Sequence, residues 1–136
     1  MKKFNSILLV EDDSIAAIVC KRTIEINNCA ESIVVKENGK EAIKYIIDLI
    51  TNKDVLPEII LLDINMPVMN GWDFLHEFNN LQLAKEQIPP LIFILSSTAN
   101  PEDFTKATLF NSVKDFIPKP FKKEHLNLIE SYTENE

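Results

Sequence analysis

Glycine is nearly absent from this chain of 136 residues, in which only Gly39 and Gly71 occur. A loop that cradles a nucleotide phosphate needs several closely spaced glycines, because its backbone must approach the phosphate without interference from side chains. Two isolated glycines cannot form such a loop. The sequence therefore excludes a dinucleotide-binding half-domain.

Cysteine and histidine are also scarce, with two residues of each type. Cys20 and Cys29 do not form a C-x-x-C pair, and no Cys/His spacing, whether with His76 or with His125, is typical of a zinc site. We therefore expect two reduced thiols, as in a cytoplasmic protein, and two solvated histidines at the surface.

Basic residues are outnumbered, since 14 Lys and Arg stand against 21 Asp and Glu and give a net charge of −7. This excess of acids disfavours binding to a nucleic-acid backbone. No apolar run approaches the roughly 20 residues that cross a bilayer, and the acids at 11–13 interrupt the first run too early for a signal peptide. We expect a cytoplasmic protein that contacts neither nucleic acid nor membrane, with residues 1–136 forming a single domain.

Short aliphatic runs alternate along the chain with segments of helical pattern. Near-continuous aliphatic runs between helices are typical of buried parallel strands. The predicted strands cover residues 7–10, 33–35, 59–62, 91–95 and 113–118, and the predicted helices begin near residues 14, 39, 72, 101 and 122. Because βαβ crossovers are right-handed and place helices on both faces, the alternation predicts an α/β fold with a doubly wound, five-stranded parallel sheet and five helices.

Reactive side chains follow four of these runs. Glu11 and Asp12 follow the first run and Asp63 follows the third. Ser96 follows the fourth run, and Lys119 follows the fifth. In open α/β sheets the binding crevice lies at the carboxyl ends of the strands. We therefore expect the three acids, the hydroxyl and the lysine to converge at one edge of the sheet.

This set of side chains suits a divalent cation and a phosphoryl group. Mg²⁺ prefers oxygen ligands, and neighbouring carboxylates are costly to pack together without a cation. Asp63 is the best candidate for a nucleophile, because carboxylates form acyl phosphates. Lys119, held between two prolines, can neutralise phosphoryl charge. Taken singly, Asp63 also fits a turn-initiating residue, Ser96 a polar strand end and Lys119 a solvated lysine.

Four segments, taken in order, resemble the receiver domain of bacterial two-component response regulators, in its stand-alone, chemotaxis-regulator-like form. The segments are residues 9–13, 62–71, 95–96 and 119–121. The most specific of them is the pattern Asp-x-x-Met-Pro-x-x-x-Gly that begins at Asp63, and the resemblance extends from Ile7 to about Tyr132. It implies a flavodoxin-like sheet with the strand order 2-1-3-4-5.

The resemblance implies a phosphorylation-activated signalling switch. Asp63 would accept a phosphoryl group from a sensor histidine kinase or a histidine phosphotransfer protein. Mg²⁺ would be bound by Asp12, Asp63 and the backbone carbonyl of Asn65, with Glu11 acting through water. Lys119 would contact the phosphoryl oxygens, and its bond to the next proline is typically cis. Such a domain is not an enzyme with a separate substrate, because it catalyses only its own phosphoryl transfer and autodephosphorylation.

The same resemblance assigns the switch to Ser96 and Phe116. The hydroxyl would move toward the phosphoryl group, and the aromatic ring would swing inward behind it. Many relatives have threonine and tyrosine here, so in this chain the two states of Phe116 must differ by packing rather than by a hydrogen bond. Asn65 and Thr98 occupy the positions that resemble those setting the dephosphorylation rate. The signal would leave by protein–protein contact with a downstream target or, in a homodimer, with a second copy of the chain.

The sequence has three alternatives to a stand-alone receiver domain. A phosphatase of the haloacid-dehalogenase type needs a second acid two residues after the nucleophile, where this chain has Asn65. A pseudo-receiver that serves only as an interaction module typically lacks an acid or the lysine, whereas Asp63 and Lys119 are both present. A fragment of a larger regulator is the alternative to a stand-alone domain.

Overall fold

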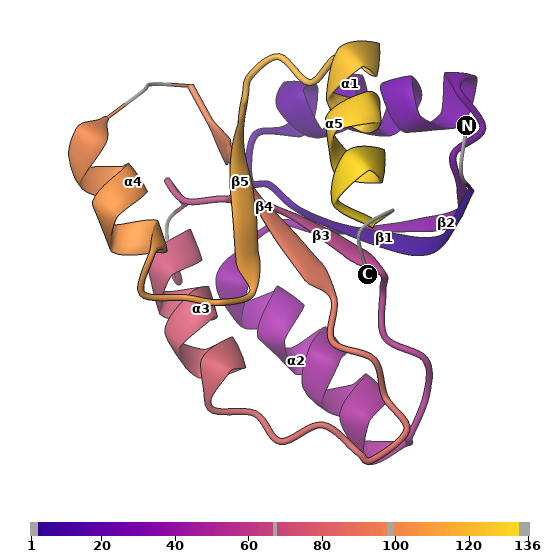
Figure 1. Ribbon diagram of the computed structural model, residues 1–136, viewed down its shortest axis with the longest axis vertical. Coiled ribbons are helices and arrows are strands. Elements are labelled where there is room, and N and C mark those ends of the chain that lie inside the picture. Colours follow the sequence, from indigo (N-terminus) through magenta and orange to yellow (C-terminus); the bar gives the residue numbers. More distant parts are fainter. Residues whose placement is uncertain (1–2, 67, 98–99, 134–136) are drawn as a thin grey trace.

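The computed structural model describes residues 3–66, 68–97 and 100–133. Within these residues five strands alternate with five helices, as the sequence predicts (Figure 1). The elements are β1 (Phe4–Val10), α1 (Ser14–Ile26), β2 (Ala30–Lys36), α2 (Gly39–Thr51), β3 (Ile59–Asp63), α3 (Gly71–Asn79), β4 (Leu91–Ser96), α4 (Pro101–Ala107), β5 (Val113–Pro118) and α5 (Lys123–Thr133).

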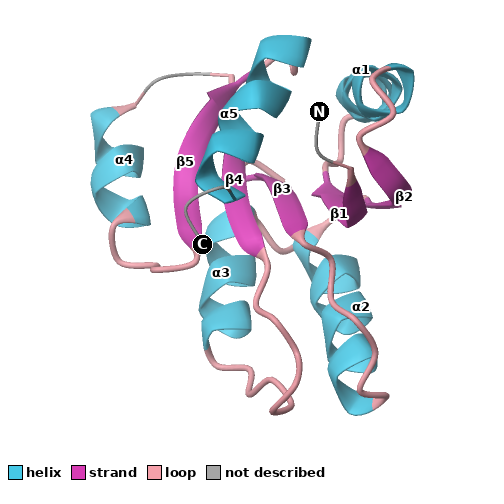
Figure 2. Cartoon of the chain, turned by 45° about the vertical axis from the view of Figure 1, so that its right-hand side comes forward, coloured by secondary structure: helices cyan, strands magenta, loops and turns pink. Residues whose placement is uncertain are grey.

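The five strands form one parallel sheet in the order β2-β1-β3-β4-β5. Helices α1 and α5 cover one face, and α2, α3 and α4 cover the other (Figures 1 and 2). This is the predicted doubly wound, flavodoxin-like fold. Because all strands run in the same direction, their carboxyl ends lie along one edge of the sheet.

Two hydrophobic cores flank the sheet because successive strand residues point to opposite faces. In β1, Leu8 and Val10 belong to the core beneath α2, α3 and α4, whereas Ile7 and Leu9 belong to the core beneath α1 and α5. All four side chains are fully buried. Since full burial of such a side chain contributes about 1.5–3 kcal/mol, the central strands are firmly anchored at the positions that precede the predicted site.

Strands β1 and β2 begin earlier than their aliphatic runs. The polar residues Asn5 and Ser6 extend β1, because Phe4 and Ser6 pair with Ala30 and Ser32 of β2. Glu58 supports the same end of the sheet, since its carboxylate accepts a hydrogen bond from the Asn5 backbone at 2.6 Å. Pairing with a neighbouring strand therefore adds residues that the hydrophobic pattern does not mark.

Polar side chains cap the N-termini of α1, α3 and α4. Asp13 accepts a hydrogen bond from Ile15 N at 2.9 Å and caps α1, so this acid serves the helix rather than the acidic cluster. Asn70 and Asp73 form a capping box at α3. Asn100 caps α4, with Pro101 in the first turn as predicted.

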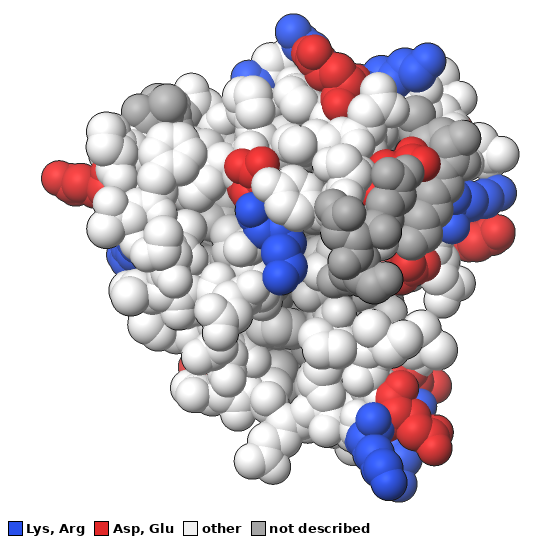
Figure 3. Space-filling view, viewed as in Figure 1, with Lys and Arg blue, Asp and Glu red and all other residues white. Residues whose placement is uncertain are grey.

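The charged side chains are spread over the surface. On the face drawn in Figure 3, Lys and Arg lie interspersed with Asp and Glu, and the described residues form no continuous basic surface there.

Among the helices of residues 3–66, 68–97 and 100–133, none is long and apolar enough to cross a membrane. Cys20 and Cys29 are both free and buried, and burial raises the pKa of the Cys20 thiol to about 12, which keeps it protonated.

Helices α1 and α2 both end in a Schellman motif. At the end of α2, Asp54 N donates to Leu49 O at 2.9 Å and Lys53 N donates to Ile50 O at 3.1 Å. This motif requires a left-handed residue after the cap, and Lys53 takes that place with φ of 56°. At the end of α1 the same place is taken by Asn28, which tolerates the conformation better than lysine does.

We expect Lys53→Gly to raise the free energy of unfolding by about 0.5–1 kcal/mol, because glycine removes the cost of the left-handed conformation and loses part of this gain to its unfolded-state entropy. Chemical denaturation at neutral pH measures the effect. Lys53→Ala is the matched control, since it removes the same side chain but keeps the Cβ. A gain of equal size in the alanine variant would show that the backbone conformation is not the cause.

Candidate phosphoacceptor and metal site

The predicted site residues meet at the carboxyl edge of the sheet. Glu11 and Asp12 follow β1, and Asp63 is the last residue of β3. Ser96 ends β4, and Lys119 follows β5. Neighbouring strands β1, β3, β4 and β5 thus bring the five residues to one edge of the sheet, as expected from parallel strands.

Three carboxylates form the acidic part of the site. Oxygen atoms of Glu11, Asp12 and Asp63 all lie within 4.8 Å of one another. Glu11 and Asp63 are buried, with 2% and 3% of their surfaces exposed, whereas Asp12 is exposed to solvent. Two acids therefore form the floor of the site and the third forms its rim.

Lys119 supplies the positive charge. Its Nζ lies 2.6 Å from Glu11 Oε1 and 3.5 Å from Asp63 Oδ2. The backbone fixes its position, because Lys119 N donates a hydrogen bond to Ser96 O at 3.0 Å. The bond between Lys119 and Pro120 is cis, as the family resemblance implies. The ammonium group is therefore held between the two buried acids.

Burial and neighbouring charges shift two pKa values in the site. Desolvation, reinforced by the nearby Asp63, raises the pKa of Glu11 to about 8, although Lys119 acts in the opposite direction. Burial alone would lower the pKa of Lys119, but Glu11 and Asp63 outweigh it, so the net shift of this pKa is upward. Glu11 therefore keeps its proton to a higher pH than an ordinary glutamate, and Lys119 keeps its proton to a higher pH than an ordinary lysine.

The donor atoms suit a hard divalent cation. Both carboxylate oxygens of Glu11 are buried, and no described residue gives them a well-directed hydrogen bond apart from the close ion pair with Lys119. A buried carboxylate in this condition is costly unless a cation or an ordered water completes its surroundings. Clustered carboxylate oxygens are the ligands that such a cation prefers. The residues present therefore fit a divalent metal.

Asn65 lies next to the acceptor through its backbone. Its N–H donates to Asp63 Oδ1 at 3.1 Å, and its side chain is exposed. This hydrogen bond fixes the orientation of the Asp63 carboxylate. The ligand role predicted for the Asn65 carbonyl and the role of its side chain in dephosphorylation stay predictions. Thr98, assigned to the same process, lies outside the described residues.

Gly71 has a steric role that the motif alone does not explain. A Cβ atom at this position would lie 2.6 Å from Ile64 Cα and 2.7 Å from Asp63 O, closer than real Cβ contacts. Gly71 N also donates to Ile64 O at 3.2 Å. The start of α3 therefore packs directly against the backbone of the acceptor, and only glycine permits this approach.

The loop between β3 and α3 carries backbone strain that the sequence does not reveal. Val68 has φ of 71°, a left-handed conformation that is unfavourable for a β-branched residue. Its side chain is 78% exposed, so burial does not compensate for the strain. Gly39 N, at the start of α2, donates to Met69 O at 3.0 Å and holds the loop from the other side. Strained residues held in this way are typical of functional sites.

The two predicted switch residues lie on the neighbouring strands β4 and β5, two residues apart in register. Ser96 is buried at the end of β4, and Phe116 is half-buried in β5, where it pairs in register with Ile94. The Phe116 ring contacts the Phe104 ring of α4, with centroids 4.4 Å apart. The structure thus brings both residues to the strands that flank the site, and Phe116 connects them to α4.

Comparison with known proteins identifies the class to which this fold and site belong. The chain belongs to the response regulator receiver domain family, whose match covers residues 7–129. Receiver domains are phosphorylation-activated switches that interact with histidine kinases or phosphotransfer proteins and bind a divalent metal at an acidic pocket. The buried cluster of Glu11, Asp12 and Asp63 fits the phosphoaspartate site of such a domain.

Individual relatives agree with this class. The cell cycle response regulator CtrA of Brucella ovis is 37% identical over 122 residues, which cover 88% of this chain but 46% of CtrA. The chain thus spans about half the length of the curated relatives it matches. A two-component response regulator from Cytophaga hutchinsonii has a similar crystal structure, with a TM-score of 0.86, 29% identity and coverage of 99% of this chain and 100% of that one. The Mn²⁺-bound response regulator Rcp1 shares the fold, with a TM-score of 0.69, 19% identity and coverage of 92% and 88%.

We expect the metal-free protein to lose stability as the pH rises from about 5 to about 8. The pKa of Glu11 is about 8 in the folded state, against 4.5 for an unperturbed glutamate, so the folded state binds an extra proton in this window. Its contribution to the free energy of unfolding is complete below the unfolded pKa and is lost as the pH passes the folded one. Urea unfolding in the presence of a chelator at several pH values measures this slope.

Two variants isolate Glu11 as the source of the slope. Glu11→Gln keeps the size of the side chain but cannot titrate, so the slope should flatten. Glu25→Gln, at an exposed position of α1, should leave it unchanged. An equal slope in wild type and Glu11→Gln would assign the pH dependence to another group. Added divalent metal should oppose the loss of stability, because it binds the deprotonated acids.

Proposed function

We propose that Asp63 is the phosphoacceptor of a cytoplasmic signalling switch in which residues 1–136 form a single receiver domain. A sensor histidine kinase or a histidine phosphotransfer protein donates the phosphoryl group, and the signal leaves by protein–protein contact. The protein catalyses only its own phosphorylation and dephosphorylation. The observation that carries the proposal is the position of Asp63, buried at the end of a central strand and 3.5 Å from Lys119 Nζ.

The acceptor oxygen of Asp63 acts as the nucleophile. It forms a bond to phosphorus while the bond between phosphorus and the donor histidine nitrogen breaks. The electron pair of that bond returns to the donor imidazole, which takes a proton from solvent. The Asn65 N–H supports this role, because its hydrogen bond to Oδ1 restricts the orientation of the carboxylate.

Lys119 stabilises the charge on the transferring group. A phosphoryl group on Asp63 brings additional negative charge to a place where the ammonium already lies close to two acids. Because its pKa is raised, the lysine stays protonated and can contact the phosphoryl oxygens. A neutral residue here would leave the bound metal ion alone to neutralise the new charge.

Mg²⁺ is the metal that we assign to the acidic cluster. Asp12 and Asp63 would hold it directly, Asn65 would contribute its backbone carbonyl, and Glu11 would act through water. The bound ion supplies charge neutralisation for the acids and the incoming phosphoryl group. The donor set of clustered carboxylates supports the assignment, as does the Mn²⁺-bound form of Rcp1, a protein of the same fold.

Ser96 and Phe116 are proposed to convert phosphorylation into a change of surface. The Ser96 hydroxyl would bond to a phosphoryl oxygen, and the Phe116 ring would move in response. Both residues are placed for this, since Ser96 ends the strand next to Asp63 and Phe116 lies on the strand beyond it. Phosphorylation can shift an equilibrium only through contacts that differ between its two states, and this hydroxyl would provide such a contact.

We expect the purified protein to incorporate phosphate from acetyl phosphate when Mg²⁺ is present, and to lose this labelling when a chelator replaces the metal. Asp63→Asn should abolish labelling, because the amide cannot act as the nucleophile. Asp12→Asn should raise the Mg²⁺ concentration that half-maximal labelling requires. Intact-protein mass spectrometry with peptide mapping measures the modification.

Asp48→Asn is the matched control for charge, since Asp48 is an exposed acid of α2 that is not among the site residues. Its labelling should equal that of wild type. Full labelling of Asp63→Asn at a different residue would refute the assignment of the acceptor, and an unphosphorylated wild-type protein would favour an interaction module without phosphoryl chemistry.

We expect Ser96→Ala to accept phosphate yet respond weakly to it, because the hydroxyl connects the phosphoryl group to the rest of the sheet. The response is the change in backbone amide shifts around Phe116 on addition of beryllofluoride, a phosphoryl mimic. Ser96→Thr should keep the response, since it keeps the hydroxyl. Ser97→Ala is the neighbouring control, and an undiminished response in Ser96→Ala would show that another residue couples the site to Phe116.

A further inference from the structure

We propose that Asp115 and Tyr132 form a clamp that ties the last turn of α5 to the backbone of Phe116 and thereby sets the balance between the two states of the switch. The inference rests on the proposed function, in which Phe116 is the switch residue. Tyr132 and Asp115 would be positioning residues, because neither lies among the acceptor and metal-binding residues.

The clamp acts on a backbone group that the sheet leaves open. β5 is an edge strand, so one of its sides has no neighbouring strand among the described elements. Lys119 N donates to Ser96 O of β4. Successive residues of a strand direct their backbone N–H groups to opposite sides of the strand. Phe116 lies three positions before Lys119, so its N–H points away from β4, toward the open edge.

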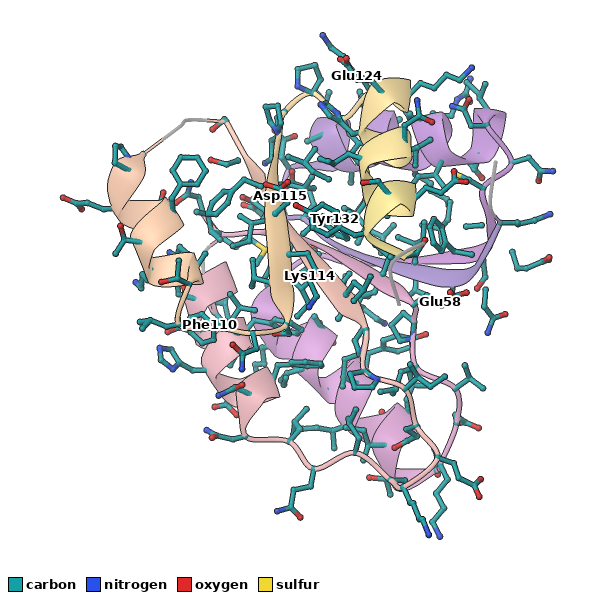
Figure 4. All side chains as sticks on the ribbon, in the orientation of Figure 1. Glu58, Phe110, Lys114, Asp115, Glu124 and Tyr132 are labelled. Carbon is teal, nitrogen blue, oxygen red and sulfur yellow. The ribbon has the colours of Figure 1, made fainter. Side chains whose placement is uncertain are left out.

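The Asp115 carboxylate occupies this open position. Its Oδ1 accepts the hydrogen bond of the Phe116 N–H at 2.8 Å, and its Oδ2 accepts a hydrogen bond from the Tyr132 hydroxyl at 2.7 Å. Figure 4 shows Asp115 on β5 and Tyr132 on α5 next to each other. Each oxygen of one carboxylate therefore holds a different element, and the carboxylate joins them.

The neighbouring lysine does not compete for this carboxylate. Lys114 Nζ donates instead to the backbone oxygen of Asn111, at 3.3 Å, and Asn111 belongs to the turn before β5. The hydrogen bond from Tyr132 raises the pKa of its own hydroxyl, because the nearby Asp115 charge opposes ionisation. The hydroxyl stays protonated at neutral pH and remains a donor.

The clamp reaches both layers of helices. Asp115 and Tyr132 lie on the side of the sheet that α5 covers, where the Tyr132 ring also packs edge-on against Phe93 with centroids 5.5 Å apart. The Phe116 ring points to the opposite face and contacts Phe104 of α4. Restraint of the Phe116 backbone by α5 is thus transmitted to a ring that packs under α4.

This geometry makes the last turn of α5 an input to the switch. A protein contact that displaces the end of α5 would remove the Tyr132 hydrogen bond, free the Asp115 carboxylate and release the Phe116 backbone. The two ring positions of Phe116 would then be weighted differently. Because binding and switching are coupled reciprocally, phosphorylation would in turn change the affinity for that contact.

Tyr132→Phe tests the clamp with the smallest change, since it removes the hydroxyl and keeps the ring against Phe93. We expect the beryllofluoride concentration at half-saturation to change by about twofold to tenfold, the range that one ordinary hydrogen bond supplies. The Phe116 amide resonance of the unliganded variant should also move along the line that connects the free and beryllofluoride-bound positions of wild type. Asp115→Ala, which removes both hydrogen bonds, should change the half-saturation concentration at least as much, and it is compared by that measurement alone because it removes the acceptor of the Phe116 amide itself.

Tyr45→Phe is the matched control. The chain has two tyrosines, and Tyr45 lies on α2, where its ring faces Lys36 rather than the switch. The control should leave both measurements at wild-type values. A shift of the Phe116 amide off the line, with unchanged half-saturation, would assign the contact a merely structural role and overturn the proposal.

Two further outcomes separate the possible failures. If Tyr132→Phe and Asp115→Ala change only self-association, measured by sedimentation, the pair guards the open edge of β5 against strand pairing and the clamp is refuted. If wild type itself does not respond to beryllofluoride, the proposed function fails first, because Phe116 is then not a switch. A wild-type response that both variants retain unchanged refutes the clamp alone.

Discussion

The contact between Lys119 and the two buried acids is the constraint on which the rest of the structure depends. A buried carboxylate is costly to keep charged, and two of them within a few ångströms are costlier still. Lys119 Nζ, 2.6 Å from Glu11 and 3.5 Å from Asp63, offsets part of this cost. The contact joins the ends of β1, β3 and β5, which the parallel sheet places along the same edge.

Burial of the aliphatic strands offsets the free-energy cost of this arrangement. Residues of β1 and β3 are fully buried between two helical layers and contribute the hydrophobic stabilisation that holds charged groups at the sheet edge. Local features complete the site. Gly71 lets α3 pack on the acceptor backbone, Asp13 caps α1, and Val68 is held in a strained conformation beside them. Stability elsewhere in the fold compensates for strain and charge at this edge.

The sequence was sufficient to predict what depends on local pattern. Aliphatic runs indicated all five strands, and the residues after them were the ones that meet in space, from Glu11 to Lys119. The polar start of β1 was not marked by any run, because Asn5 is in a strand only through pairing with β2. The contacts of Tyr132 with Asp115 and of Phe104 with Phe116 join elements whose relative orientation no periodicity reveals. These contacts between helices and β5 therefore had to come from the structure.

The acceptor and the switch place opposite demands on the sheet, and the strand order separates them. Asp63 ends the central strand β3, where neighbours on both sides keep it fixed. Phe116 lies on the edge strand β5, which has one neighbour and is irregular in register near Phe93. An edge strand with fewer backbone hydrogen bonds moves at lower cost than a central one. Because adjacent residues of β5 face opposite helical layers, a displacement of this one strand changes the packing of α4 and α5 together.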